Sequence, residues 1–499
     1  MSSTSALIIA FACGLMLLIS FLIGVWSRKK AATSQAFFGG TAMFGPLAVG
    51  LSSMAAVASA FALVGVPGLI YNTGNAMVFW MMGSCAFAIS YIILGKKVRG
   101  MAEIAEISSL GDVCDVRFNN NRYIKAVMSV IITLGCVGYL AAQISAGTAL
   151  VTNLIHVSPI VAGIIVFGLL TVYTAMSGEV GGLLSQAFQG GVMVVAGVVL
   201  IISFFSVTGG FGNILAAVSE AGTVTGANGI TKEFSSDFLN AWGTYPGGIA
   251  LTWMVIPALG CVGQPQVLAR MYSLKDPMSL PRTGLVTAIS HAIVSFLCVA
   301  MGYAAIYLVA SGTIDPLASA DDAIYAFANH CGLYAQILAY VAIFAAALSS
   351  ASMFLSSSST LLSRDLPAAI GIRIKPENQL RVSKIFMVIL GIVSIVVSVY
   401  SSELVGLLGT FGWGTLVSGT FPVFIVGLLW ERCNATGVTV GITYSLIFNI
   451  LPLATSFKYP STLPAYFITS AVAIALTVII SLLTPKKEPD KKVELVMKL

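Results

Sequence analysis

The stretch that decides the fold lies between residues 45 and 75, and its central run reads Leu51-Ser52-Ser53-Met54-Ala55-Ala56-Val57-Ala58-Ser59-Ala60-Phe61, followed by Gly65-Val66-Pro67-Gly68. It is apolar enough to cross a bilayer but is poor at staying helical, because its small residues, serines and Gly-x-Pro-Gly run leave backbone carbonyls without helical partners. A membrane tolerates such carbonyls only where the backbone is buried in protein or lines a cavity. The stretch therefore predicts a broken membrane helix beside an ion or substrate site.

A second interrupted span lies in the other half of the chain. Between residues 253 and 270, another hydrophobic run is interrupted by Pro257, Gly260, Gly263 and Pro265. Paired broken spans in corresponding halves of a chain indicate the midplane binding site of a secondary transporter. The two stretches together predict such a site between them.

The composition places the chain in a membrane. Hydrophobic residues make up 58% of the 499 residues and charged residues only 9%, and the mean hydropathy is +0.96, which excludes a soluble globular chain and a disordered one. Apolar runs of about 20 residues recur, the length needed to cross a bilayer, and they are continuous and rich in Gly and Ala, as in packed helices. The net charge of +6 requires no nucleic-acid partner, and the eight cysteines show no CxxC spacing, so neither a disulfide framework nor a metal cluster is expected.

Hydropathy and helix breakers predict an all-α polytopic fold with thirteen transmembrane helices. The predicted spans are 5–27, 44–72, 75–95, 123–152, 158–176, 183–207, 246–272, 284–312, 334–363, 380–400, 403–430, 434–454 and 462–484. With the amino terminus outside, 23 of the 25 Lys and Arg residues fall on inner segments and only Lys232 and Lys458 fall outside, in agreement with the positive-inside rule. We therefore expect the carboxy terminus inside, with residues 485–499 as a charged, mobile cytoplasmic tail.

A third stretch is a long helix lined with hydroxyl groups. It reads Ala345-Ala346-Ala347-Leu348-Ser349-Ser350-Ala351-Ser352-Met353 and continues to Ser356-Ser357-Ser358-Ser359-Thr360 and Arg364-Asp365. Na⁺ is a hard cation, and main-chain carbonyls with serine hydroxyls can supply its oxygen ligands without a carboxylate. Alternatively, the serines back-bond to their own helix or permit close packing. The spacing alone supports the two interpretations equally.

At these motifs the chain resembles the sodium:solute symporters, a family with the inverted-repeat fold of the bacterial leucine transporter, and most of all the bacterial proline- and pantothenate-type permeases. The resemblance covers nearly the whole chain and depends on Leu51-Ser52, Gly65-Val66-Pro67-Gly68, Tyr173-Thr174-Ala175-Met176-Ser177-Gly178, Gly263-Gln264-Pro265-Gln266-Val267-Leu268-Ala269-Arg270, Ala346 to Ser350 with Arg364-Asp365, and Trp430-Glu431-Arg432-Cys433-Asn434-Ala435-Thr436-Gly437. It implies a single transporter domain, 1–484, with an extra first helix (5–27), two inverted repeats (44–207 and 246–430) and two peripheral helices (434–484).

The resemblance also implies a sodium site. Its ligands are the carbonyls of Ala55 and Ala58 in the first broken helix, the carbonyl of Ala346, and the hydroxyls of Ser349 and Ser350. As the coupling ion, Na⁺ ties the broken helix to the serine helix and favours an outward-open state. Coupling follows because each ligand stabilises the state that the other prefers.

Solute contacts are expected from the two broken helices and from the fourth and eleventh spans. The candidates are Ser59, Ala60, Leu63, Gln143, Trp253, Cys261, Gln264 and Trp413. Packing is the simpler interpretation of the two tryptophans. The two glutamines are stronger candidates, because an unpaired amide buried in a bilayer is costly.

Two positions depart from the family pattern. Val57 stands where proline carriers have an aspartate, and Gln186 stands near the start of the sixth span, where many members have one. The predicted spans also contain no clearly buried Asp, Glu, Lys or Arg. These departures disfavour a second, carboxylate-assisted sodium site and proton coupling through a membrane carboxylate.

The sequence thus predicts a multi-pass plasma-membrane symporter that imports a small organic solute with Na⁺. The solute is an amino acid, carboxylate, sugar or vitamin, and the oligomeric state stays open. A proton-coupled or uncoupled carrier with the same fold is the alternative. A transporter-like sensor is less well supported, because the tail of about 15 residues has no room for a signalling domain. An enzyme is not expected, since no nucleophile, base or metal cluster converges in the spans.

Overall fold

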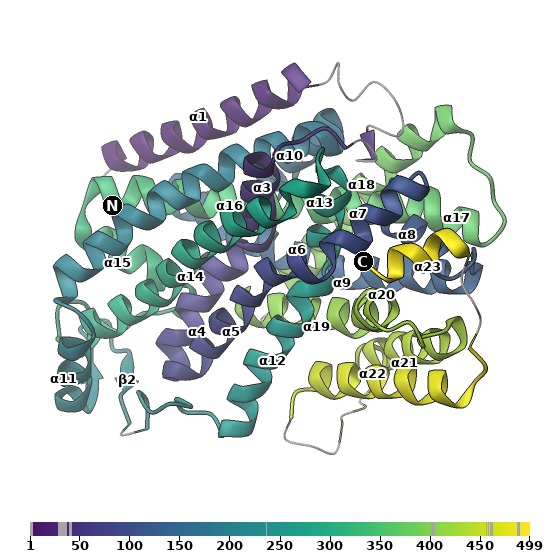
Figure 1. Cartoon of the computed structure of the whole chain (residues 1–499). Coiled ribbons are helices and arrows are strands. Elements are labelled where there is room, and N and C mark those ends of the chain that lie inside the picture. The colour runs from purple at the N-terminus through teal and green to yellow at the C-terminus, as the bar shows by residue number, and fades with distance from the viewer. Residues whose placement is uncertain are drawn as a thin grey trace.

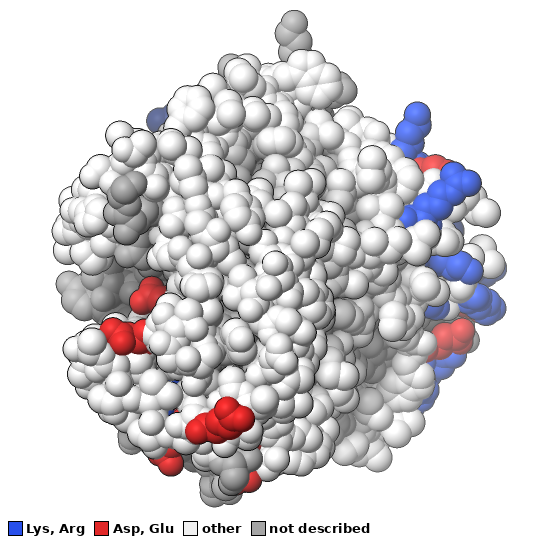
Figure 2. Space-filling view, turned by 90° about the vertical axis from the view of Figure 1, so that its left-hand side faces the viewer, with Lys and Arg blue, Asp and Glu red and all other residues white. Residues whose placement is uncertain are grey.

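The computed structural model describes residues 3–27, 37–38, 42–235, 237–400, 405–455, 457, 459, 463–486 and 490–499. Within them, 11 helices are long and apolar enough to cross a membrane, and two shorter apolar helices lie at 46–57 and 159–172. On the face shown in Figure 2, a broad middle zone lacks charged side chains, most Lys and Arg lie along the right-hand edge, and Asp and Glu lie mainly at the left and bottom. A wide uncharged zone is what a lipid bilayer requires of the surface it covers.

The elements of the first half of the chain are α1 (Ser3–Ser27), α3 (Pro46–Val57), the π-helix η2 (Phe61–Gly65), α4 (Val66–Thr73), η3 (Gly74–Met77), α5 (Val78–Ser84), η4 (Cys85–Ile89), α6 (Ser90–Ile93), α7 (Gly95–Ile104), α8 (Leu110–Arg117), α9 (Arg122–Ile155), α10 (Pro159–Thr208), α11 (Phe211–Ala221), β1 (Thr223–Thr225) and β2 (Thr231–Glu233). The two strands pair antiparallel, with Val224 opposite Lys232.

The elements of the second half are α12 (Gly247–Gly263), α13 (Pro265–Ser273), η5 (Pro277–Ser279), α14 (Leu280–Ala310), η6 (Ala320–Asp322), α15 (Ala323–Cys331), α16 (Leu333–Thr360), the π-helix η7 (Leu361–Asp365), α17 (Leu366–Ala369), α18 (Pro376–Tyr400), α19 (Val405–Thr420), the π-helix η8 (Phe421–Val426), α20 (Gly427–Leu429), α21 (Ala435–Ala454), α22 (Ala465–Leu483) and α23 (Lys491–Met497).

Helices occupy all thirteen predicted segments among the described residues. Two of these segments, 158–176 and 183–207, are joined in the single element α10, which is interrupted only at Gly178. There φ is 53° and ψ is −167°, a backbone conformation that glycine adopts readily because it has no Cβ. The number of membrane crossings and the sidedness of the termini stay predictions.

Both predicted helix breaks are present. The first follows α3, which ends at Val57, and Ala58 has non-helical angles of φ −75° and ψ 80°. The second lies at Gln264, with φ −66° and ψ 141°, between α12 and α13. Pro265 begins α13, where its missing N–H costs no helical hydrogen bond. The second break lies at Pro265 as the sequence indicates, whereas the first lies at Ala58, before the Gly65-Val66-Pro67-Gly68 run, which stays helical in η2 and α4.

The first broken helix lies at the centre of the molecule. α3 contacts α10, α14, α13 and α16, and its residues from Ser52 to Val57 are all buried. Gly190 of α10 permits this close packing, because a Cβ there would lie 2.6 Å from the Leu51 carbonyl oxygen. In Figure 1, α1 lies along the outside of α10, and α21 and α22 form a separate pair at the lower right, in yellow-green. The helix break at Ala58 is thus enclosed by protein on all the described sides of α3.

The expectation that the spans contain no buried charged side chain is wrong. Glu179 of α10 is 8% exposed and Arg270 of α13 is fully buried, and the two form an ion pair. Asp365, at the end of η7, is also fully buried, 3.8 Å from the Lys125 ammonium. These residues lie at span ends in the sequence, but the neighbouring helices cover them, and the charges compensate one another.

The end of the chain also differs from the expected mobile tail. Residues Lys491–Met497 form α23, which Asp490 caps through a hydrogen bond to the Lys492 N–H at 2.8 Å. Its apolar side chains are buried against α7, where Gly100 leaves room for Val496. Figure 1 shows this yellow helix beside α7. The three buried residues, Val493, Val496 and Met497, form one helical face, which explains why the segment docks.

Candidate functional site

Two serines of α16 reach the broken end of α3. Ser349 Oγ lies 2.7 Å from the Ala55 carbonyl oxygen and 3.1 Å from the Ala346 carbonyl oxygen. Ser350 Oγ lies 3.3 Å from the Ala55 oxygen and 3.1 Å from that of Ala56. Both serines are fully buried. Four of the five predicted sodium ligands are therefore linked by these contacts.

Ala58, the fifth predicted ligand, lies at the break itself. Its N–H still bonds to the Met54 carbonyl at 2.7 Å, but its ψ of 80° turns its own carbonyl out of the helical pattern. Among the described hydrogen bonds, none joins Ala58 to the serines. The site thus combines a turned-out carbonyl with hydroxyl and carbonyl oxygens from a neighbouring helix, and such an oxygen-only set suits a hard cation.

The candidate solute contacts begin immediately after the break. Ser59 Oγ lies 2.6 Å from the Tyr139 hydroxyl of α9. The Ala60 N–H donates to Gln143 Oε1 at 2.9 Å, and Gln143 Nε2 donates to the Tyr139 carbonyl at 3.4 Å. The Gln143 side chain of α9 therefore accepts the Ala60 N–H that follows the break, and the buried Gln143 amide has a partner on the broken helix.

Aromatic rings enclose this part of the site. Tyr139 lies 4.7 Å from the ring of Phe354, 5.8 Å from Trp413 and 6.1 Å from Phe61, between ring centroids. Trp80 contacts both Phe61 and Trp413, at 5.3 and 6.0 Å. Trp413 is 2% exposed, and its indole N–H has no described hydrogen-bond partner. The cluster places one free donor among apolar surfaces, as small-molecule sites commonly do.

Gln264 occupies the second break and is fully buried. Neither its amide oxygen nor its amide nitrogen has a partner among the described residues. Leaving a buried amide unpaired costs about 1–3 kcal/mol, so a ligand that bonds to it gains affinity. The Gln264 amide therefore stays a solute candidate, and Gln266 of α13, which the sequence analysis did not single out, is equally buried and has both amide atoms without a described partner.

The remaining candidates are placed less centrally. Leu63 is fully buried in η2. Trp253 packs its ring 5.0 Å from Tyr245, just before the start of α12, rather than in the Tyr139 cluster. The side chain of Cys261 lies outside the described residues. The structure thus brings Ser59, Ala60, Gln143 and Trp413 together around Tyr139 but does not bring Trp253 to them.

Sequence reasoning missed three contributors to the site. The Ala56 carbonyl follows directly from its place beside Ala55, so the serine motif could have indicated it. Trp80 and Phe354 carry no such signal, because an aromatic residue in an apolar span is most often packing. Their role becomes visible only when α5 and α16 are placed beside α9.

The chain is similar in sequence to known membrane transporters. A sequence model of the sodium:solute symporter family matches residues 37–444. The chain is 26% identical to the sodium/pantothenate symporter of Escherichia coli K12, over 87% of this chain and 89% of that protein. It is 24% identical to an osmoregulated proline transporter of Bacillus subtilis 168, over 94% of each.

The fold is also that of a solved transporter. A structure of a Na⁺-coupled sialic acid symporter superposes with a TM-score of 0.78 at 20% identity, and the match covers 97% of this chain and 99% of that one. The family and these relatives are transporters rather than enzymes, and the chain is a multi-pass plasma-membrane protein. The family match over most of the length, together with two broken helices around a buried oxygen cluster, leads to one conclusion: this chain belongs to the sodium:solute symporter family.

Proposed function

We propose that the protein imports a small organic solute together with Na⁺ by alternating access. The observation that carries the proposal is the contact of Ser349 and Ser350 with the Ala55 carbonyl, at 2.7 and 3.3 Å. It joins the first broken helix to a helix 294 positions further along the chain. A cation held by Ala55, Ala58, Ala346, Ser349 and Ser350 would stabilise that junction, so sodium binding and helix position are linked.

The same break supports coupling to a solute. Ala58 contributes to the sodium site, while Ser59 and Ala60 face Tyr139 and Gln143. A shift of one short segment therefore changes both sites, which is the physical requirement for symport. The described solute candidates carry no charge: they are hydrogen-bonding groups, one aliphatic side chain and one aromatic ring, namely Ser59, Ala60, Leu63, Gln143, Gln264 and Trp413.

The transported class comes from the relatives. Pantothenate and proline are named for the two curated proteins and sialic acid for the structural neighbour. We therefore propose a small polar organic solute for this chain. The proposed moving parts are the repeats 44–207 and 246–430, with the amino terminus outside and the carboxy terminus inside.

The experiment is a thermal-stability screen of the purified protein. Pantothenate, L-proline, sialic acid and short monocarboxylates are tested in Na⁺ and in K⁺ at equal ionic strength, beside Ser349→Ala. A solute that stabilises wild type only in Na⁺, and fails to stabilise the variant, supports the proposal, because a ligand stabilises the state that it binds. Stabilisation by a solute that depends on neither Na⁺ nor Ser349 overturns the proposal.

A proton-coupled carrier is the second candidate, and the burial of the Glu179 side chain is the observation that favours it. A buried carboxylate inside a membrane protein is often a proton site, and this one is 8% exposed. Repeating the screen in K⁺ at two pH values separates the two, since a proton-coupled carrier responds to pH in the absence of Na⁺.

A further inference from the structure

A buried ion-pair network lies beside the proposed sodium site. Glu179 follows the Gly178 kink in α10 and pairs with Arg270 of α13. The second terminal nitrogen of Arg270 donates to Gln186 Oε1 and lies 3.2 Å from Met353 Sδ of α16. Arg270 has no exposed surface. One guanidinium therefore holds α10, α13 and α16 together.

The network continues directly to the sodium site. Gln186 Nε2 donates to Ser352 Oγ at 3.1 Å, and Ser352 Oγ donates to the Ser349 carbonyl at 2.9 Å. Ser349 is one of the proposed sodium ligands. A continuous chain of hydrogen bonds thus leads from Arg270 to the residue that binds the ion.

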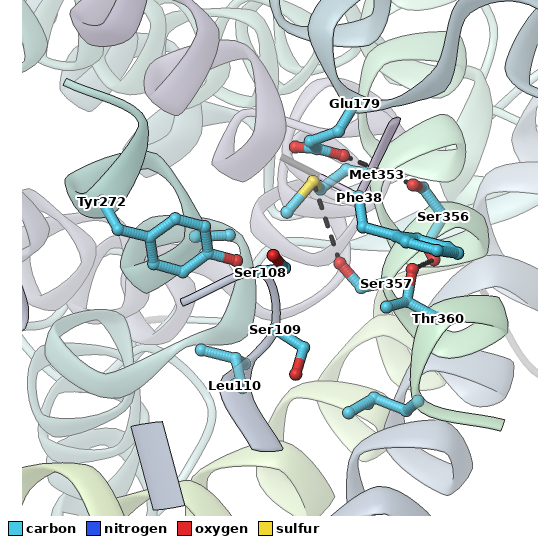
Figure 3. Close-up of a pocket in the computed structure, with 12 residues that line it drawn as sticks. Phe38, Ser108, Ser109, Leu110, Glu179, Tyr272, Met353, Ser356, Ser357 and Thr360 are labelled. Carbon is cyan, nitrogen blue, oxygen red and sulfur yellow. Dashed lines mark hydrogen bonds between the residues drawn. The ribbon is translucent and has the colours of Figure 1, made fainter. Parts of the chain in front are cut away.

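A pocket reaches the network from the opposite side. Most of its polar lining consists of hydroxyl groups, and in Figure 3 the Glu179 carboxylate lies near Met353 and Ser356, with Ser357 and Thr360 lower on the pocket wall. Ser356 Oγ donates to Glu179 Oε2 at 3.3 Å. Tyr272, on α13 beyond Arg270, also lines the pocket. Hydroxyl and carboxylate oxygens are the ligands of a hard cation, so the lining suits an ion that leaves the site.

The pocket lies at the basic end of the molecule. Its lining includes Ser108 and Ser109, and just beyond them Asp112 accepts from Arg364 at 2.8 Å. The positive-inside pattern places these segments at the cytoplasmic face. The ion pair therefore separates the proposed sodium site from the side where the ion must be released.

Electrostatics determine what the ion pair does there. An arginine stays charged at every physiological pH, and at low dielectric a fixed positive charge strongly repels a second cation. While Arg270 bridges Glu179 and Gln186, its guanidinium occupies Oε1 of both side chains, so these oxygens are not free to bind Na⁺. If α13 moves away from α10, the guanidinium leaves with it, and the Glu179 carboxylate becomes free beside the pocket hydroxyls.

We propose that the Glu179–Arg270 pair is the inner closure of the ion path and that the freed Glu179 carboxylate is the first group to bind Na⁺ on its way into the hydroxyl-lined pocket. The inference rests on the proposed symport, since it assigns a path to the same ion. The kink at Gly178 lies directly before Glu179, and it provides a joint at which the two parts of α10 can change their angle.

Cysteine accessibility tests the closure. Ser357→Cys places a thiol on the pocket wall, and a membrane-impermeant maleimide is applied to inside-out vesicles in Na⁺ or K⁺. The chain without this substitution gives the background from its native cysteines. The key variant adds Glu179→Gln with Arg270→Gln, which removes both charges and leaves neither one buried alone.

The closure predicts that labelling of Ser357→Cys in Na⁺ is slow and becomes about tenfold faster in the doubly neutralised variant. That factor corresponds to a change of about 1.4 kcal/mol in the free energy that separates the closed and open states. Neutralising the exposed pair Lys375 and Glu377, 3.9 Å apart, serves as the matched control and leaves the rate unchanged. Equal rates with and without the buried pair would overturn the inference.

Arg270→Lys is the second variant, for the case that double neutralisation prevents folding. Lysine keeps the charge but cannot reach Glu179 and Gln186 at once, so labelling is expected to rise about threefold, and an unchanged rate contradicts the closure. Thermal stabilisation of the unlabelled protein by Na⁺ is measured in parallel. Its absence from wild type would contradict the proposed symport, whereas the labelling comparison tests the closure independently.

Discussion

Removing the Ser349 hydroxyl should weaken sodium binding far more than it weakens the fold. Ser349 Oγ lies 2.7 Å from the Ala55 oxygen, so Ser349→Ala loses one hydrogen bond, worth about 0.5–1.5 kcal/mol of unfolding free energy. The sodium complex loses one of five proposed oxygen ligands. Taking the charge-assisted value of about 1.5–3 kcal/mol for that ligand, the half-saturating Na⁺ concentration rises roughly 10- to 150-fold.

The assay is a Na⁺ titration of the thermal midpoint in detergent, with K⁺ holding the ionic strength constant. Ser358→Ala is the matched control, because Ser358 is equally buried on α16 and lies more than two helical turns away. The control should keep the wild-type titration. If Ser349→Ala is folded and titrates with the wild-type midpoint, the assignment of the ion to this junction is refuted.

Three further perturbations follow from the packing. Gly190→Ala places a Cβ 2.6 Å from a backbone oxygen of α3 and should cost about 1–3 kcal/mol of unfolding free energy. The added Cβ of the control Gly191→Ala meets nothing within 4 Å, so this variant should not be destabilised. Equal thermal midpoints for the two variants would contradict this packing. Gln143→Leu leaves the Ala60 N–H without its acceptor, so it should cost about 1–3 kcal/mol and abolish solute-dependent stabilisation in the thermal screen; an unaltered screen would exclude this contact. Burial lowers the pKa of Lys232 from 10.5 to about 8, so the unfolded chain binds this proton more tightly than the folded chain. Stability against unfolding should therefore rise with pH between those two values. The thermal midpoint of Lys232→Gln should lack that rise, and a retained rise would assign it to another group.

The helix breaks could be predicted from the sequence because they depend on local chemistry. Pro265 lacks the N–H that would continue α12, and Ala58 lies in a run of small residues that holds a helix weakly. Pro257 and the Gly65-Val66-Pro67-Gly68 run, in contrast, stay within helices. The docked carboxy-terminal helix also had a local signal. Val493, Val496 and Met497 have the spacing of one helical face, and this spacing, rather than the surrounding lysines, determines the position of the segment.

The contact proposed to hold sodium could not be derived from spacing alone. Ser349 and Ala55 are 294 positions apart, and the hydroxyls are equally compatible with back-bonding to their own helix. The family resemblance supplied the pairing, and the structure brings the atoms together. Sequence patterns describe faces of helices, whereas an ion site depends on which faces meet.

The buried charges were missed for a related reason. Glu179 follows Ser177 and Gly178, and this local composition resembles a connecting loop. Its partner Arg270 is 91 positions away and also lies at the end of a predicted span. Only the packing of α10 against α13 and α16 shows that these span ends are covered and that Gln186 accepts a hydrogen bond from Arg270.

The most direct test of the central claim is reciprocal flux in proteoliposomes. The solute identified in the thermal screen is added outside vesicles that contain wild type or Ser349→Ala/Ser350→Ala, and the entry of radioactive Na⁺ is measured at zero membrane potential. Coupling requires that an inward solute gradient drives Na⁺ uptake in wild type, and that the double variant loses this uptake. Solute entry into wild-type vesicles without any Na⁺ uptake would contradict the account.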